Sequence, residues 1–262
     1  MKGFIKFVGT AGARFVVARQ LRRSGGVWYE LNGVKLLMDP GPGSLVTVLK
    51  SRPKLNPVSL TALWLTHKHI DHSNDMNILI EAMTDGSKKQ QGEVFAPSDC
   101  LDGEPVIMRY LREFPKRISI LQENTTYSIG EKLQCRTSIR HDHQVETYGV
   151  HFLSPEGQIS HMIDTAFFPD LLEDYKDADI LILHVVRYKD KGDRARGILH
   201  LNLDNAREII AAIRPRLTIL THFGMTMLQN KPWLLARQLS DEIGVEVKAA
   251  SDGMTLKVED YL

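Results

Sequence analysis

The stretch Thr66-His67-Lys68-His69-Ile70-Asp71-His72 decides how the fold of this chain is interpreted. It places three imidazoles and one carboxylate within six positions, directly after the apolar run 60–65. Because side chains alternate along an extended segment, its first two histidines and its aspartate are expected to point the same way, while the last histidine points elsewhere. Imidazole and carboxylate ligands suit zinc, iron or manganese. The stretch therefore predicts a site for two metal ions rather than a chance gathering of surface histidines.

Apolar patterns on both sides predict the elements that hold this stretch. The run 60–65 is typical of a buried strand, and 75–84 has apolar residues at helical spacing, so the histidines are expected in a strand-to-helix loop. A helix is also expected over 105–114. The first forty residues are expected to form short strands at 4–8, 27–31 and 34–38, joined by turns that include Gly25-Gly26. Further strands are predicted over 93–96, 118–121, 133–139, 149–153, 161–163, 180–186, 217–220, 245–247 and 254–258, and further helices over 204–213 and 233–243.

The bulk properties of the chain exclude several classes of protein. Its 262 residues are 43% hydrophobic and 25% charged, as in ordinary globular proteins. With 33 Lys+Arg against 32 Asp+Glu, no overall basic field draws it to nucleic acid or to a membrane. No apolar stretch is long enough to span a bilayer, and the first residues do not form a signal peptide, so a cytoplasmic protein is expected. Strands and helices intermix without a linker or a repeat, which predicts one α/β domain over 1–262.

The pattern HxHxDH at 67–72 resembles the defining motif of the metallo-β-lactamase superfamily. Three later segments continue the resemblance in family order at predicted strand ends. They are 140–149, which contains two histidines, 161–166, which contains Asp164, and 220–224, which contains His222. The resemblance implies a four-layer αββα sandwich with its site in a shallow groove at one edge.

The resemblance also implies a set of ligands for two divalent metal ions, with zinc first and manganese or iron as alternatives. Water bound to such ions loses its proton near neutral pH and becomes the nucleophile. Asp39 is expected to orient a ligand histidine through a hydrogen bond. By the resemblance, His67, His69 and His143 bind one ion, Asp71, His72 and His222 bind the other, and Asp164 bridges the two.

Two histidines compete for one of these positions. His141 and His143 lie two residues apart and are able to share one face of a strand. The family pattern His-x-Val-x-x-x-Gly fits His143, Val145 and Gly149, so His143 is the favoured ligand. If His141 is not a ligand, it is expected to be a solvated residue of the strand.

His200 is expected to take part in catalysis together with Asp71. It stands just before the predicted helix 204–213, where phosphodiesterase branches of the superfamily place a histidine that acts on the scissile phosphate or its leaving group. His184 lies within an apolar run and is left open between a core residue and a pocket residue. His151 and His161 are expected to be structural, and Arg14 and Arg187 are candidates for contact with a substrate anion.

The choice of reaction depends on weaker features. The Gly-rich turn at 8–14 is similar to that of the branch with ribonuclease Z and cyclic phosphodiesterases, and with His200 it favours a phosphodiester substrate. The short segment between His143 and Asp164 leaves no room for a tRNA-binding arm, so a small cyclic or linear phosphodiester is preferred to nucleic acid. The alternatives are a lactone, thioester or β-lactam hydrolase, and a non-hydrolytic metal-binding module or di-iron redox protein with a separate flavin partner. The oligomeric state is left open, with a homodimer among the alternatives.

Overall fold

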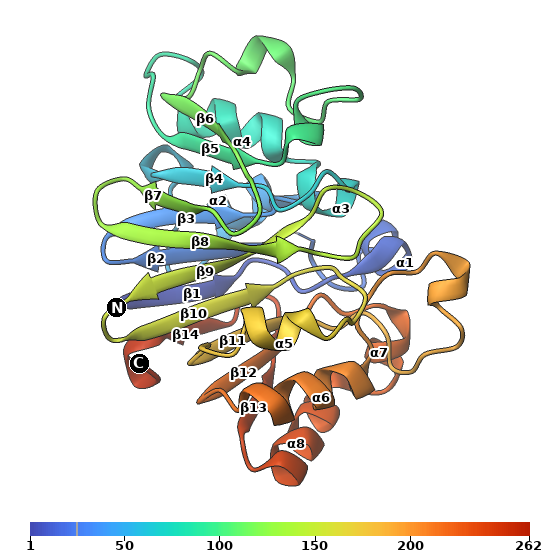
Figure 1. Cartoon of the computed structure of the whole chain (residues 1–262). Coiled ribbons are helices and arrows are strands. Elements are labelled where there is room, and N and C mark those ends of the chain that lie inside the picture. The colour runs from blue at the N-terminus through green and yellow to red at the C-terminus, as the bar shows by residue number, and fades with distance from the viewer. Residues whose placement is uncertain (25) are drawn as a thin grey trace.

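Two seven-stranded mixed sheets packed face to face form the frame of the molecule (Figure 1). The computed structural model describes residues 1–24 and 26–262, so Gly25 of the predicted turn lies outside the described residues. The first sheet has the order β14-β1-β2-β3-β4-β5-β6 and the second has the order β13-β12-β11-β10-β9-β8-β7. The strands of the first sheet are β1 (Gly3–Phe7), β2 (Val27–Leu31), β3 (Val34–Met38), β4 (Ala62–Trp64), β5 (Glu93–Ala96), β6 (Arg117–Ile120) and β14 (Thr255–Lys257). Those of the second sheet are β7 (Thr126–Ile129), β8 (Leu133–Arg140), β9 (Tyr148–Ser154), β10 (Gly157–Met162), β11 (Ile180–His184), β12 (Leu217–Thr221) and β13 (Glu246–Ala249).

A continuous apolar core fills the space between the sheets. In β1, Ile5 and Phe7 point into this core, whereas Phe4 and Val8 pack on the opposite face beneath the helices. The alternation follows from the period of two along a strand. Core residues extend from Met1 to Val258 and come from both sheets.

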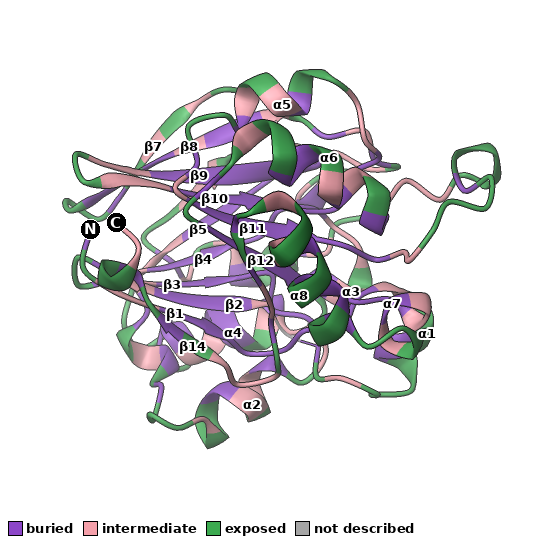
Figure 2. Ribbon diagram, turned by 90° about the horizontal axis from the view of Figure 1, so that it is seen from below, coloured by how far each residue is buried: buried purple, intermediate pink, exposed green. Residues whose placement is uncertain are grey.

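Helices cover the outer face of each sheet and complete the four layers (Figure 2). The first sheet carries α2 (Ser44–Lys50) and α4 (Met76–Met83), whose buried residues share a cluster with Leu63 and Val94. The second carries α5 (Asp170–Asp174), α6 (Leu203–Ile213) and α8 (Pro232–Ile243). No helix in the described part of the chain is long and apolar enough to cross a membrane. The predicted αββα sandwich is therefore confirmed.

The structure corrects the predicted helix over 105–114. Only a 3-10 turn at Arg109–Leu111 forms there. Ile107 and Leu111 are buried at helical spacing, which explains the prediction. However, the side chain of Asn77 accepts from the Met108 N–H at 2.9 Å and donates to the Val106 carbonyl at 2.8 Å, and so engages backbone groups that a helix would use.

Three short helices surround the predicted site without having been predicted. They are α1 (Ala13–Ala18), α3 (Ile70–Ser73) and α7 (Met225–Gln229). Because α3 begins within the histidine stretch, Asp71 and His72 lie on a helical turn rather than in an extended segment. The simple alternation expected for the whole stretch is wrong from Ile70 onward.

Candidate metal centre

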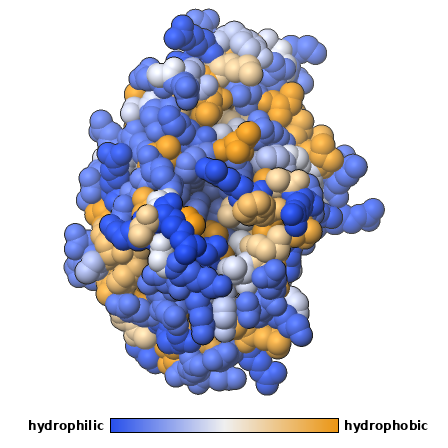
Figure 3. Space-filling view, turned by 90° about the vertical axis from the view of Figure 1, so that its right-hand side faces the viewer, coloured by the Kyte–Doolittle hydropathy of each residue, from blue (hydrophilic) through white to orange (hydrophobic). Residues whose placement is uncertain are grey.

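The candidate residues come from the carboxyl ends of strands that run in the same direction. These ends, after β4, β8, β10, β11 and β12, meet at one edge of the sandwich, on the right of Figure 1. Polar side chains that follow neighbouring parallel strands gather at such an edge. The face that contains this edge is largely hydrophilic and is hollowed near its middle (Figure 3).

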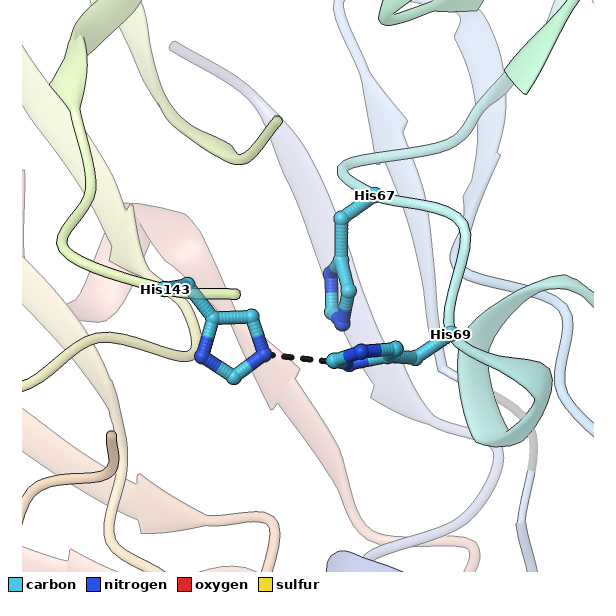
Figure 4. Close-up of side chains that lie close together, drawn as sticks. All are labelled: His67, His69 and His143. Carbon is cyan, nitrogen blue, oxygen red and sulfur yellow. Dashed lines mark hydrogen bonds between the residues drawn. The ribbon is translucent and has the colours of Figure 1, made fainter. Parts of the chain in front are cut away.

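The first cluster consists of His67, His69 and His143, whose rings converge from two loops (Figure 4). One nitrogen from each ring lies within 4.8 Å of the others. His143 Nε2 is 3.0 Å from His69 Nδ1, and the ring centres of His67 and His143 are 5.1 Å apart. Burial lowers the pKa of all three imidazoles, so they are neutral and their lone pairs are available to a cation.

The second cluster places two carboxylates against two imidazoles. His222 Nε2 lies 3.4 Å from Asp164 Oδ1 and 3.6 Å from Asp71 Oδ2. His72 Nε2 lies 3.5 Å from Asp164 Oδ2 and 3.8 Å from Asp71 Oδ2. Ligand atoms around a tetrahedral zinc ion with bonds of about 2.1 Å are about 3.4 Å apart, so these spacings fit a shared cation. The ring centres of His67 and His72 are 4.0 Å apart, which makes the two clusters adjacent.

Asp39 fixes the tautomers of two imidazoles. Its Oδ2 accepts from the Thr66 hydroxyl at 2.7 Å, so the Thr66 oxygen accepts in turn from His67 Nδ1 at 3.1 Å. The same Oδ2 accepts from His72 Nδ1 at 2.9 Å. With each Nδ1 occupied as a donor, the Nε2 atoms of His67 and neutral His72 carry the lone pair that a metal requires.

His143 follows the same rule through the backbone. Its Nδ1 donates to the Leu199 carbonyl at 3.0 Å, which leaves Nε2 facing His69 as an acceptor.

His72 differs from the other candidate ligands in its charge. Burial lowers the pKa of His72, but the carboxylates of Asp71, Asp39 and Asp164 around it outweigh burial and raise it well above 6.5. A cation bound here would replace that proton.

Unpaired buried nitrogens provide the test of whether a metal fits. Within the described residues, the Nε2 atoms of His67, His72 and His222 and Nδ1 of His200 are buried without a hydrogen-bond partner. A buried polar atom without a partner costs about 1–3 kcal/mol, so four of them at one place require an explanation. Asp71, His72 and His222 also border a cavity of about 20 Å³, which holds one water-sized sphere. Cations bound at the two clusters would satisfy the three Nε2 atoms and the buried carboxylates together.

A chain of hydrogen bonds leads from Asp164 into the core between the sheets. Asp164 Oδ1 is 2.9 Å from His184 Nδ1, His184 Nε2 is 3.0 Å from His161 Nε2, and His161 Nδ1 is 2.8 Å from the Tyr29 hydroxyl. All four groups are buried. Burial lowers the pKa of His161 to about 3 and that of His184 well below 6.5, and it raises the pKa of Tyr29, so the last three groups are neutral.

Only one arrangement of protons satisfies this chain. Asp164 is an acceptor, so His184 must carry its proton on Nδ1, and its Nε2 must then accept from His161. His161 Nδ1 is therefore an acceptor, and the Tyr29 hydroxyl donates to it. The reverse order would place the lone pair of His184 against the Asp164 carboxylate. The chain thus fixes the tautomer of both histidines and the orientation of one Asp164 oxygen.

His200 lies at the rim of the second cluster, where the sequence places it. Its Nδ1 is 3.6 Å from Asp164 Oδ2, and burial lowers its pKa to about 4. The start of α6 holds this position, because the Asn202 side chain accepts from the backbone N–H groups of Asp204 and Asn205. His200 is therefore a neutral, partly exposed imidazole whose Nδ1 is buried beside the candidate ligands.

The Gly-rich turn near the N-terminus supports His222. His222 has a left-handed backbone with φ of 58°, which is unusual for a residue other than glycine. Gly12 N–H donates to the Phe223 carbonyl at 3.1 Å, and Phe223 N–H donates to the Thr10 carbonyl at 2.9 Å. A Cβ added to Gly12 would lie 2.2 Å from the His222 carbonyl oxygen. Glycine is required at position 12 because the turn packs directly on this strained residue.

Two interpretations of single residues are corrected. His141 is not a solvated strand residue: it is buried, with Nε2 3.0 Å from the Tyr175 hydroxyl. This placement leaves His143, and not His141, beside His67 and His69. Arg187 is not free for a substrate anion, because its guanidinium forms a two-contact ion pair with Asp193 at 2.8 and 3.0 Å.

Three further residues position the candidate ligands through hydrogen bonds that the sequence did not predict. The sequence assigned no role to Tyr29 or Thr66, and it assigned only a structural role to His161. Only Thr66 gave a signal, because it precedes the histidine stretch directly. The partners of Tyr29 lie 132 residues away in the chain.

Comparison with known proteins gives a consistent result. Residues 35–223 match the family model described as the beta-lactamase superfamily domain. The uncharacterised protein MJ1374 of Methanocaldococcus jannaschii is 30% identical over 267 residues, covering 99% of this chain and 96% of that protein. The metallo-beta-lactamase fold protein YhfI of Bacillus subtilis has a TM-score of 0.77 at 18% identity, covering 97% of this chain and 98% of its own. A diphosphatase from the PhnP family has a TM-score of 0.71 at 18% identity, covering 98% of this chain and 97% of its own.

Proposed function

This chain belongs to the metallo-β-lactamase superfamily, and on that premise we propose that it is a metal-dependent hydrolase that cleaves a small phosphodiester. Two divalent cations, with zinc first and manganese or iron as alternatives, supply Lewis acidity and lower the pKa of a bound water. The proposed ligands of one cation are His67, His69 and His143. Those of the other are Asp71, His72 and His222, with Asp164 between the two sets.

The observation that carries this proposal is the group of unpaired nitrogens around Asp164. His67, His72 and His222 each turn a buried Nε2 toward the site without a protein partner in the described structure. Asp39 and Thr66 hold two of these rings from behind. No protein group in the described structure satisfies these three atoms, whereas the nitrogens of His161 and His184 behind the site are all paired.

His200 is the feature that favours a phosphodiester over an acyl substrate. Hydrolysis of a phosphodiester expels an alkoxide, which needs a proton or a hydrogen bond as it leaves. A neutral imidazole whose Nδ1 lies 3.6 Å from Asp164 stands beside the proposed ligands and is able to donate a hydrogen bond to such a group. It transfers a proton to the leaving group once the negative charge of the bound phosphodiester has raised its pKa and protonated it. In this proposal Asp71 and Asp164 hold the site together, and His200 acts on the substrate.

The fold comparison supports an enzyme that acts at phosphorus. The fold is shared over nearly the whole chain with a protein named as a diphosphatase. A large RNA substrate is less favoured, because residues between His143 and Asp164 are used by β9, β10 and short connections. The near balance of 33 basic and 32 acidic residues also makes a large RNA substrate less favoured, because RNA binding depends on an excess of positive charge.

A substrate panel tests the reaction class. Steady-state turnover is measured with bis(p-nitrophenyl) phosphate, with 2′,3′-cyclic nucleotides and with a set of lactones, using metal-replete protein. The proposal predicts turnover of at least one phosphodiester that stops when a chelator is added. Turnover of lactones with none of the phosphodiesters would contradict the proposed substrate class and leave the metal-dependent hydrolase in place.

The chain from Asp164 to Tyr29 gives a prediction about metal affinity. Tyr29→Phe removes the hydroxyl that donates to His161 Nδ1, so a buried lone pair loses its donor and the rings of His161 and His184 are held less firmly behind Asp164. We expect a loss of about 1–3 kcal/mol in the free energy of unfolding and a loss of metal affinity of about tenfold. Calorimetric titration with Zn²⁺ measures the affinity, and ¹H–¹⁵N NMR of the imidazoles in the metal-free protein reports the tautomers.

Tyr127→Phe is the matched control, because the Tyr127 hydroxyl donates to the Ile120 carbonyl at 3.0 Å, outside this chain. It is expected to leave metal affinity unchanged. If Tyr29→Phe binds zinc as tightly as the unchanged protein, the positioning role of this chain is wrong.

A further inference from the structure

A second cavity lies away from the metal centre, on the outer face of the first sheet. Its volume is about 230 Å³, and it is bordered by β1, the end of α2 and the turn before β14. Four of the side chains that line it are cationic, and none is acidic. They are Lys6, Arg23, Lys50 and Arg52, with the hydroxyls of Thr47 and Ser51 beside them.

The positive charge of this cavity is not neutralised by the protein. Within the described residues, none of the four cationic side chains has a carboxylate partner within 4.0 Å. The acidic residue Asp252 precedes the lining residue Gly253 in the chain, but its side chain does not line the cavity and bonds to other groups. Its Oδ1 accepts from the Thr10 N–H and hydroxyl, and its Oδ2 accepts from the Arg23 backbone N–H at 2.8 Å.

Lys6 is the least expected of these cations. It lies on the face of β1 where Phe4 and Val8 pack beneath α2, and only 3% of it is exposed. Its ammonium donates to the Arg52 and Gly253 carbonyls at 2.9 and 3.0 Å and to the Thr255 hydroxyl at 3.1 Å. These acceptors satisfy its hydrogen bonds but carry no net charge. Burial lowers the pKa of Lys6, as expected for a cation that lacks a counter-charge.

We propose that this cavity binds the phosphate groups of a small phosphorylated molecule. Buried or clustered cations without carboxylates attract an anion, and arginine and lysine side chains bind phosphate oxygens through charge-assisted hydrogen bonds. At about 230 Å³ the cavity is smaller than the roughly 300–1,000 Å³ of typical small-molecule pockets, which suits one or two phosphate groups rather than a whole nucleotide. The hydroxyls of Thr47 and Ser51 provide further donors. The site is separate from the metal ligands, since no residue lines both cavities.

Calorimetric titration with inorganic pyrophosphate tests this site on the full chain. Lys50→Glu is compared with Lys54→Glu, which makes the same charge change four residues away, outside the lining. We expect Lys50→Glu to weaken binding about tenfold or more, because a charge-assisted contact becomes a repulsion, and Lys54→Glu to weaken it less than about threefold. His69→Ala, altered at the metal centre, is expected to bind pyrophosphate as the unchanged protein does.

Several outcomes would overturn the proposal. Equal weakening by Lys50→Glu and Lys54→Glu would show attraction by overall charge, and loss of binding in His69→Ala would place pyrophosphate at the metal centre. No detectable binding at millimolar pyrophosphate and low salt would remove the site. If a 5′-phosphorylated oligoribonucleotide binds through Lys50 more tightly than pyrophosphate, the ligand is nucleic acid and the assignment to a small molecule is wrong.

Discussion

Asp164→Asn is expected to reduce hydrolysis by about a thousandfold and to remove at least one metal ion from the protein. Asp164 is a buried carboxylate among three imidazoles of the site, with oxygens 3.4 Å from His222, 3.5 Å from His72 and 3.6 Å from His200. His222, His200 and the hydrogen bond from His184 hold its pKa well below the usual range despite burial, so it is an anion that offsets the charge of bound cations. Loss of about 4 kcal/mol of charge stabilisation in the transition state corresponds to about a thousandfold in rate.

Asp179→Asn provides the control for this substitution. Asp179 precedes β11, at the opposite end of the strand from His184, and forms an ion pair with Arg216 at 3.2 Å. It is expected to keep its metal content and its activity. Metal content is measured by elemental analysis and folding by circular dichroism. A folded Asp164→Asn protein with full metal content and turnover would contradict the assignment of Asp164.

His200→Ala is expected to keep both metal ions and to lose about a hundredfold or more in phosphodiester turnover. General acid or base groups contribute about 10²–10⁴-fold to such reactions. The side chain stands at the rim of the cluster, and the capped start of α6 fixes its backbone, so its removal should leave the other ligands in place. Turnover and metal content are measured on the same preparation.

A second variant separates the two roles that His200 is able to play. His200→Gln retains a hydrogen-bonding side chain but has no imidazole for proton transfer, so it should be as slow as His200→Ala if proton donation is the role. If His200→Ala loses a metal ion, His200 is a ligand. If it keeps both ions and full turnover, His200 has no part in catalysis.

The strands other than β7 and the main histidine positions were predictable because their signals are local. The apolar runs at β4 and β12 are each followed by a threonine and then a histidine, and buried parallel strands end at the functional edge of such folds. Asp39 follows β3 and precedes a proline, which also marks a strand end. The resemblance then supplied the grouping of these residues, and the structure brings them together.

The remaining features depend on contacts between distant segments. The prediction of a helix over 105–114 was wrong because the Asn77 side chain forms hydrogen bonds with the backbone there. No local sequence pattern indicates those contacts. Tyr29 meets His161 only because the two sheets pack face to face, so the chain that orients Asp164 is invisible in the sequence. The cationic cavity was missed for the same reason, since Lys6, Arg23 and Lys50 are brought together by three different elements.

Elemental analysis of the protein, purified after growth under metal-replete conditions, tests the central claim most directly. The unpaired nitrogens of His67, His72 and His222 and the buried carboxylate of Asp164 require cations at this place. We predict two transition-metal ions per chain, both removed by a chelator and both restored by added metal. A folded protein that contains no transition metal, and takes up none when zinc, manganese or iron is supplied, would contradict the account.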